Sequence, residues 1–113
     1  MKLFTQPQWA TLLENGKRAA LDPEYNPLPV VKLFTPDAGA TWLLAWVDPE
    51  EPEIAYGLCD LGLGFPELGP VCLDELRELR GHLGLPVERD LHWEATKTLN
   101  EYAADAWAAG GVR

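Results

Sequence analysis

The chain has 113 residues, and 47% of them are hydrophobic, which is enough apolar material for one compact domain over residues 1–113. The longest apolar run, residues 42–47, is far shorter than the roughly 20 residues of a membrane span, and the N-terminus lacks the apolar centre of a signal peptide. We therefore expect a cytoplasmic protein with no membrane partner. The formal net charge of −9 repels phosphate backbones, which disfavours direct binding to nucleic acid.

The N-terminal part of the chain predicts a helix. Trp9, Leu12 and Leu13 recur at helical spacing within residues 5–16, and Gly16 can adopt the left-handed conformation that ends a helix. A proline-containing loop follows at residues 21–29.

Two strands are predicted next, at residues 30–35 and 41–47, joined by a Pro-Asp-Ala-Gly turn. The second strand is apolar on both faces, which is typical of a central strand or of a strand with an exposed face that awaits a partner. Alternation places Trp42, Leu44 and Trp46 together on one face. If that face is exposed, it predicts a homodimer through these three residues.

Residues 54–60 and 68–73 predict two more strands, separated by a glycine-rich loop. After them, Asp74 is placed to cap a short helix that runs through Arg80 and is closed by Gly81.

The last third of the chain predicts a strand and a helix. Residues 87–94 alternate strictly between two faces, which is typical of a strand. Thr98 and Glu101 fit a capping box for a final helix that ends at residues 110–111. The elements together predict an α+β fold with a mainly antiparallel sheet of four or five strands and both terminal helices packed on one face.

Acidic residues are unevenly distributed. Between residues 37 and 78 there are ten acidic residues and one basic residue, Arg77, whereas the rest of the chain holds eight of each. Residues 48–53 (DPEEPE) predict an exposed acidic turn, because their two prolines donate no backbone hydrogen bond. Such a surface attracts a basic partner surface. The candidate partner-binding residues are Asp48, Glu50, Glu51, Glu53 and Glu67.

The predicted strand at residues 87–94 also carries Glu88, Asp90, His92 and Glu94 on one face. Residues two apart on a strand lie roughly 6.6–7 Å apart, so Asp90, His92 and Glu94 could converge on one metal ion. A solvated strand face explains the same pattern without an ion. An exposed row of carboxylates also gives each group a similar environment, so it does not separate the pKa of an acid from that of a base. We favour the solvated face and expect no metal or cofactor; a metal-binding or hydrolytic role stays as the alternative.

Other catalytic patterns are weak. The glycine-rich residues 57–69 lack the lysine of a phosphate loop and carry Asp60 and Glu67 where phosphates would lie, so they predict a tight turn with glycines at positive φ. The chain has no serine, and Cys59 and Cys72 are expected to be small buried thiols. No catalytic residue is assigned, and a non-enzymatic role is favoured.

Several of these stretches resemble one bacterial family. VKLFTPD, DPEEP, GLCDLGLGFPELG, LRGHLGLPVERD and TKTLNEY are similar to the uncharacterised domain of unknown function 2958, over nearly the whole chain up to Tyr102. The resemblance implies a small intracellular protein typical of plasmids, integrative elements and phages, often encoded near conjugation and anti-restriction genes. It implies no catalytic residue.

The resulting hypothesis is a non-enzymatic acidic binding protein of a mobile genetic element. Accessory genes of such elements frequently make small acidic proteins that block host defences. We expect an inhibitor of a nucleic-acid-handling complex, such as CRISPR or restriction machinery, in which the acidic segment occupies a basic groove. A structural accessory protein that dimerises through Trp42, Leu44 and Trp46 is the third alternative.

Overall fold

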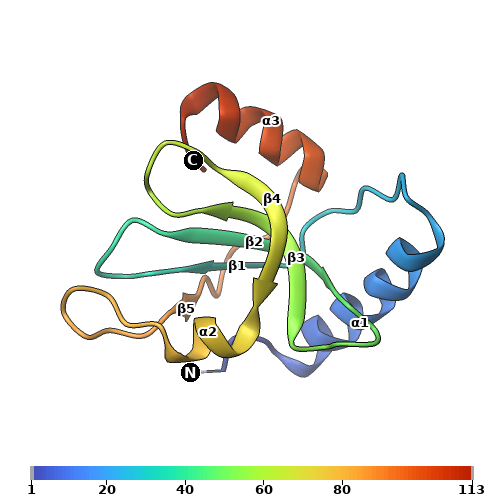
Figure 1. The fold of residues 1–113 in the computed structure, drawn as a ribbon, viewed down its shortest axis with the longest axis horizontal. Coiled ribbons are helices and arrows are strands. Elements are labelled where there is room, and N and C mark those ends of the chain that lie inside the picture. The colour runs from blue at the N-terminus through green and yellow to red at the C-terminus, as the bar shows by residue number, and fades with distance from the viewer. Residues whose placement is uncertain (1, 113) are drawn as a thin grey trace.

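The computed structural model describes residues 2–112 and has an α+β fold, which confirms the fold class expected from the sequence (Figure 1). Five strands form one sheet in the order β4-β3-β2-β1-β5, and every neighbouring pair is antiparallel. In chain order the elements are α1 (Gln6–Leu21), β1 (Val31–Phe34), β2 (Thr41–Val47), β3 (Ile54–Asp60), β4 (Glu67–Cys72), α2 (Leu73–Glu78), β5 (Glu88–Arg89) and α3 (Leu99–Ala109).

Strand β2 lies at the centre of the sheet, as its apolar character on both faces predicts. Its register against β3 shifts between Leu44 and Trp46, so Ala45 is the extra residue of a β-bulge. The bulge turns Trp46 to the face of Leu43, whereas strict alternation would place it with Trp42 and Leu44. Because Trp42 and Leu44 are buried within this chain, the three residues form no common exposed surface for a homodimer.

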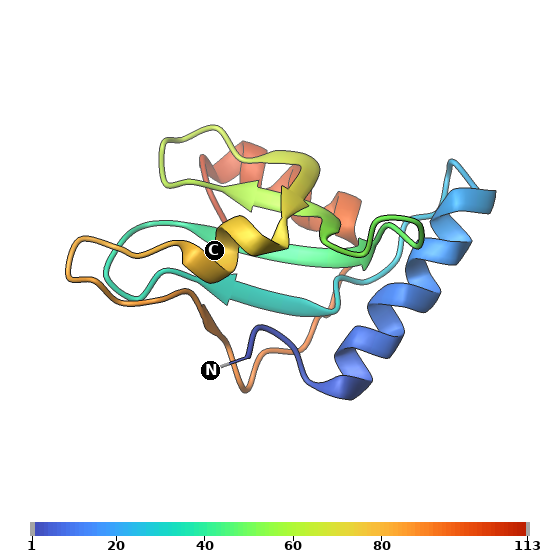
Figure 2. The same ribbon diagram turned by 60° about the horizontal axis from the view of Figure 1, so that its bottom comes forward.

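The terminal helices pack on opposite faces of the sheet, rather than together on one face as the sequence suggests. Leu12 of α1 belongs to the same hydrophobic cluster as Leu44, whereas Leu99 of α3 packs in a second cluster with Leu43. Successive strand residues point to opposite faces, so neighbouring leucines of β2 are covered by different helices. Figure 2 shows α1 and α3 on different sides of the β1–β2 pair.

Helix α1 continues to Leu21, although the sequence places its end at Gly16. Gly16 has no positive φ, and a Cβ atom at this position would lie only 1.9 Å from the carbonyl oxygen of Val47. The missing side chain therefore lets the α1 backbone lie directly against the end of β2, and good helix formers after Gly16 extend the helix. No helix within residues 2–112 is long and apolar enough to span a membrane.

Helix α2 is shorter than predicted. It begins after Cys72, which makes no side-chain cap hydrogen bond, and it ends at Glu78 rather than at Arg80. Asp74 lies in the first turn instead of at the cap, where its negative charge interacts favourably with the helix dipole. The helix packs Leu76 into the same cluster as α1.

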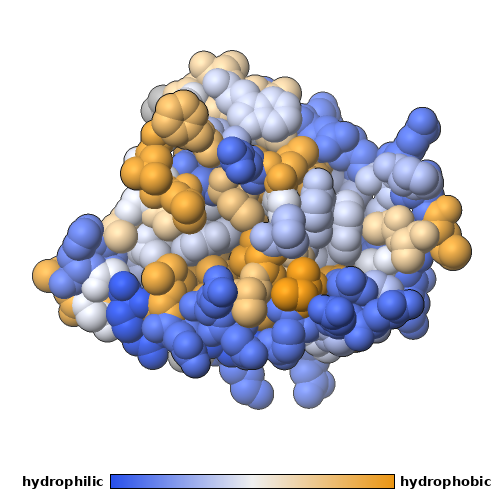
Figure 3. Space-filling model, in the orientation of Figure 1, coloured by the Kyte–Doolittle hydropathy of each residue, from blue (hydrophilic) through white to orange (hydrophobic). Residues whose placement is uncertain are grey.

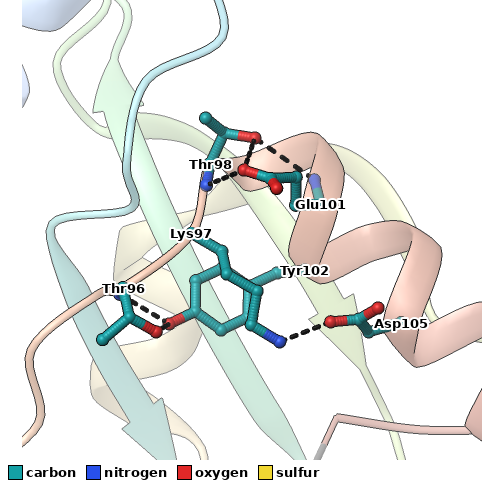
Figure 4. Close-up of polar contacts among 6 residues, drawn as sticks. All are labelled: Thr96, Lys97, Thr98, Glu101, Tyr102 and Asp105. Atoms are coloured by element: carbon teal, nitrogen blue, oxygen red, sulfur yellow. Dashed lines mark hydrogen bonds and ion pairs between the residues drawn. The ribbon is translucent and has the colours of Figure 1, made fainter.

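The start of α3 confirms the predicted capping box (Figure 4). The Thr98 hydroxyl accepts a hydrogen bond from the Glu101 amide at 3.3 Å, and the Glu101 carboxylate accepts one from the Thr98 amide at 3.0 Å. Beside the cap, the Lys97 ammonium pairs with Asp105 and lies 5.0 Å from the centre of the Tyr102 ring. These contacts fix the first turns of α3 against the preceding segment.

Candidate functional site

The turn between β2 and β3 is exposed, as the DPEEPE sequence predicts. The Asp48 amide donates to the Ile54 carbonyl at 2.9 Å, and the Ile54 amide donates to the Glu51 carbonyl at 2.9 Å. Asp48 also accepts hydrogen bonds from the amides of Glu50 at 2.9 Å and Glu51 at 3.4 Å. Asp48 thus shapes the turn, whereas the carboxylates of Glu50 and Glu51 make no ion pair within residues 2–112.

Helix α1 holds this turn in position. The contact between Gly16 and the Val47 carbonyl fixes the last residue of β2, and Pro49 Cδ would lie 3.3 Å from a Cβ atom at Gly16. Asn15 adds a hydrogen bond of 3.0 Å to the Ala45 carbonyl. The acidic turn is therefore carried by a rigid corner of the fold rather than by a free loop.

Helix α2 brings more carboxylates to the turn. Cys72 at the end of β4 pairs with Ile54, and the Leu73 amide donates to the Glu53 carbonyl at 2.8 Å. The turn and α2 together carry seven acidic side chains and one basic side chain, with a formal charge of −6. Just beyond α2, Arg80 Nη1 donates to the Arg77 carbonyl at 3.0 Å and places a second cation at the border of this surface. We call this surface the acidic edge; it consists of Asp48, Glu50, Glu51, Glu53, Asp74, Glu75, Arg77 and Glu78.

Arg77 pairs two of these carboxylates. Its Nη1 atom lies 2.6 Å from Glu53 Oε2 and 3.0 Å from Asp74 Oδ1. Partial desolvation lowers the pKa of Arg77, but the hydrogen bonds and charges of Glu53 and Asp74 outweigh it and raise the pKa above its usual value. Because the Arg77 side chain is 43% exposed, water screens these pairs and they stabilise the fold only weakly. The remaining carboxylates of α2, Glu75 and Glu78, make no ion pair in the described chain.

Glu67, the fifth residue of the predicted set, does not join the acidic edge. It pairs with Cys59, near the end of β3 farthest from the β2–β3 turn. Burial, together with the charge of Glu67, raises the pKa of the Cys59 thiol to about 11. The structure therefore brings four of the five predicted residues together and places Glu67 beside the β3–β4 loop.

The acidic edge and the β3–β4 loop beside Glu67 differ in surface hydropathy. In Figure 3 hydrophilic side chains cover the lower margin of the molecule, where Figure 1 shows α2 and the β2–β3 turn. Hydrophobic side chains gather at the upper left, over the β3–β4 loop, where Leu61, Leu63 and Phe65 are exposed. The acidic edge is thus a distinct surface of the fold.

The prediction of a strand over residues 87–94 is wrong for most of these residues. Strand β5 spans only Glu88–Arg89, which pair with Phe34 and Leu33 of β1. After Asp90 the chain turns, and the Asp90 carboxylate accepts a hydrogen bond from the His92 amide at 3.2 Å. Within residues 2–112, no group of three or more His, Cys, Asp or Glu residues is arranged to hold a metal ion. The metal-binding alternative therefore lacks the strand face on which it depends.

An apolar groove, which the sequence did not predict, lies next to the acidic edge. Its volume is about 520 Å³, and the N-terminal segment, the start of α1 and α2 form its walls. The rings of Phe4 and Trp9 are stacked in one wall, with centroids 5.7 Å apart. Its apolar lining is Leu3, Phe4, Trp9, Leu76 and Val87, and its charged lining is Lys2, Glu53 and Arg77. No sequence signal identifies this groove, because its lining comes from four separate parts of the chain.

Comparison with known proteins identifies a family. The model of the family described as Protein of unknown function (DUF2958) matches residues 3–113, which is nearly the entire chain. Searches of curated proteins and of solved structures found no match. The family match agrees with the resemblance carried by the motifs at residues 31–37, 57–69 and 96–102. The chain therefore belongs to the DUF2958 family of proteins of unknown function.

Proposed function

We propose that this protein is a non-enzymatic binding protein whose acidic edge docks on a basic surface of a partner protein. The observation that carries the proposal is the approach of α2 to the β2–β3 turn, which joins two segments with seven carboxylates in total, of which Arg77 pairs two. Glu50, Glu51, Glu75 and Glu78 are exposed and make no ion pair within residues 2–112. Their charge is therefore available to an incoming cationic surface.

The partner class that fits best is a nucleic-acid-handling complex of the host defence, such as CRISPR or restriction machinery. Such proteins hold DNA or RNA in grooves lined by lysine and arginine. A rigid surface with a formal charge of −6 can occupy a groove of this kind and exclude the nucleic acid. The expected association of this family with mobile genetic elements supports the same class of partner.

The roles within the acidic edge differ. Asp48 keeps the turn in shape through its bonds to the amides of Glu50 and Glu51. Arg77 pairs with Glu53 and Asp74, so these two carboxylates have an internal partner. The carboxylates without an internal partner then make the contacts with the basic surface. Glu67 lies outside this surface and is not needed for binding.

A pair of matched double variants tests the proposal. Glu50→Gln with Glu51→Gln removes two charges from the acidic edge, whereas Glu24→Gln with Glu94→Gln removes two exposed charges elsewhere. Binding to purified CRISPR effector and restriction complexes is measured by biolayer interferometry at low and high salt. We expect the first variant to bind roughly two- to thirty-fold more weakly at low salt and the second to bind like the wild type, since exposed ion pairs contribute roughly 0.2–1 kcal/mol each.

Competition supplies the second readout. A short DNA or RNA duplex bound by the same complex should displace the protein, and the displacement should be strongest where the wild-type affinity is most sensitive to salt. Equal losses in the two double variants, or binding that nucleic acid leaves unchanged, would contradict the proposal.

A further inference from the structure

We propose that the apolar groove beside the acidic edge receives an apolar side chain of the same partner, from a segment in which that side chain is flanked by lysine or arginine. This inference rests on the proposed function and adds to it the chemistry of the bound segment. The groove supplies an apolar anchor site, and the acidic edge supplies the charge that selects a basic flank.

The shape and lining of the groove suit an apolar anchor. Its volume of about 520 Å³ lies within the roughly 300–1,000 Å³ that is usual for ligand sites in proteins. Leu76 and Val87 form its buried apolar floor, and the stacked rings of Phe4 and Trp9 are only partly buried, so they keep apolar surface in contact with water. Binding interfaces commonly place an aliphatic or aromatic side chain in such a pocket and surround it with polar contacts.

Charge around the groove selects the flanks of the bound segment. Glu53 and Arg77 belong both to the groove lining and to the acidic edge, so the two surfaces are continuous. Arg77 is engaged by Glu53 and Asp74, and the acidic edge that continues beyond this wall carries the formal charge of −6. Lysine or arginine residues that flank the bound side chain are therefore attracted to the acidic edge.

Lys2 adds a cation to the groove lining, whose other charged residues are Glu53 and Arg77. Arg89 Nη1 donates a hydrogen bond of 2.9 Å to the Lys2 carbonyl. The basic flank of the bound segment is therefore attracted beyond the lining, to the carboxylates of the acidic edge, whereas a carbonyl or acidic group of the segment is attracted to Lys2.

Three synthetic peptides test the chemistry of the bound segment. The first is a lysine-rich amphipathic helix with leucines on one face, the second has its leucines replaced by serine, and the third has its lysines replaced by glutamine. Affinity is measured by titration calorimetry with the full chain, and the indole N–H resonance of Trp9 reports whether the groove is occupied. We expect the first peptide to bind about tenfold more tightly than either of the others and to shift the Trp9 resonance.

Two protein variants locate the binding to the groove. Gln6 is exposed and lies within the groove lining, so Gln6→Trp fills the groove without removing a core side chain. Ala10→Trp adds the same ring to an exposed position of α1 outside the lining and serves as the matched control. The preference for leucine over serine should disappear in Gln6→Trp and persist in Ala10→Trp.

The outcomes separate this inference from the proposed function. If the leucine and serine peptides bind equally and Gln6→Trp changes nothing, the groove inference is overturned, while charge-dependent binding by the acidic edge can still stand. If the glutamine peptide binds as tightly as the lysine peptide, the basic flank is overturned. If Glu50→Gln with Glu51→Gln weakens both lysine peptides equally, the leucine preference stays intact and both proposals are supported.

Discussion

The two ends of the sheet use the same kind of side chain in opposite ways. At one end, Asp37 in the β1–β2 turn and Asp60 at the close of β3 turn their carboxylates inward to backbone amides. At the other end, Glu50 and Glu51 of the β2–β3 turn point to solvent and bond to no cation within residues 2–112. The first group stabilises the fold through these hydrogen bonds, whereas the second group leaves its carboxylate oxygens open to direct contact with a partner.

The inward carboxylates connect segments that are distant in the sequence. Asp60 accepts hydrogen bonds of 2.8 Å from the amides of Gly62 and Val112, so it ties the β3–β4 loop to the C-terminal segment. Asp37 accepts hydrogen bonds from the amides of Leu83 at 2.6 Å and Leu85 at 3.3 Å. A count of acidic residues in the middle of the chain therefore overstates the number of carboxylates that can contact a partner directly, because both oxygens of Asp60 and the Oδ2 atom of Asp37 already accept hydrogen bonds from backbone amides.

The largest expected effect is a slow alkylation of the Cys59 thiol. Burial and the charge of Glu67 raise its pKa to about 11, so little thiolate exists at pH 8. In a Cys72→Ala background we expect alkylation of Cys59 by iodoacetamide to be on the order of 20- to 200-fold slower than that of an unhindered cysteine, whose pKa is about 8.5. Mass spectrometry of quenched samples measures the rate.

The same alkylation reaction tests whether Glu67 raises the pKa of Cys59 because it lies at the same end of the sheet. Glu67→Gln should accelerate the alkylation because it removes one of the two causes of the raised pKa. Glu50→Gln should leave the rate unchanged, since Glu50 lies at the opposite end of β3. Equal acceleration in both variants would show that total charge, rather than position, controls the thiol.

Asp60→Ala should cause the next largest effect. Asp60 is only 6% exposed, and its loss leaves the Gly62 and Val112 amides without their acceptor. We expect the free energy of unfolding to fall by about 1.5–3 kcal/mol, as for other hydrogen bonds to charged groups. Glu51→Ala, which removes an exposed carboxylate, should stay within about 0.5 kcal/mol of the wild type in the same urea titration. Similar losses in the two variants would remove the distinction between inward and outward carboxylates.

Gly16→Ala tests the support of the acidic turn. The new Cβ would meet the Val47 carbonyl oxygen at 1.9 Å, so the backbone of α1 or β2 must shift. Overpacking costs about 1–3 kcal/mol, and the better helix propensity of alanine offsets about 1 kcal/mol of it, so a net loss of up to about 2 kcal/mol is expected in chemical denaturation. Gly69→Ala is the control, because nothing lies within 4 Å of a Cβ atom at that position. A Gly16→Ala protein as stable as the control would show that the corner is not tightly packed.

Asp37→Asn should produce the smallest effect, visible as a change in acid stability. Desolvation raises the pKa of Asp37, but hydrogen bonds from the Leu83 and Leu85 amides outweigh it and lower the pKa below its usual 3.8. A lowered pKa means that the ionised group stabilises the fold above about pH 3.8 and that this stability is lost as the pH falls through the folded-state pKa. The variant should therefore show a shallower decline in stability below pH 4, measured by urea unfolding at a series of pH values. An unchanged slope would show that the carboxylate does not hold the loop at residues 81–85.

Local patterns predicted several elements well. The β1–β2 hairpin, the central position of β2 and the capping box at Thr98 and Glu101 are all confirmed. The positive φ values of Gly62 and Gly64 confirm the predicted tight turn. These features depend on residues close in sequence, whose turn chemistry, alternation and capping act without distant partners.

Other features required contacts that a local pattern does not contain. The bulge at Ala45 changes the face of Trp46, and its register is set by pairing with β3. Helix α1 passes through Gly16 because that residue meets the end of β2. Strand β5 stops early because the chain turns away from β1 after Asp90, whose amide still donates to the Lys32 carbonyl at 2.9 Å.

The sequence by itself determined the net charge, the exposure of the turn at residues 48–53 and the apolar character of both faces that makes β2 a central strand. Only the tertiary structure decided which carboxylates face solvent, which serve the backbone, and that α2 stands beside the β2–β3 turn. The physical reason is that charge and periodicity are properties of the chain. By contrast, which backbone amides donate to a carboxylate, and which segments form one surface, depends on parts of the chain that are distant in the sequence and meet only in the fold.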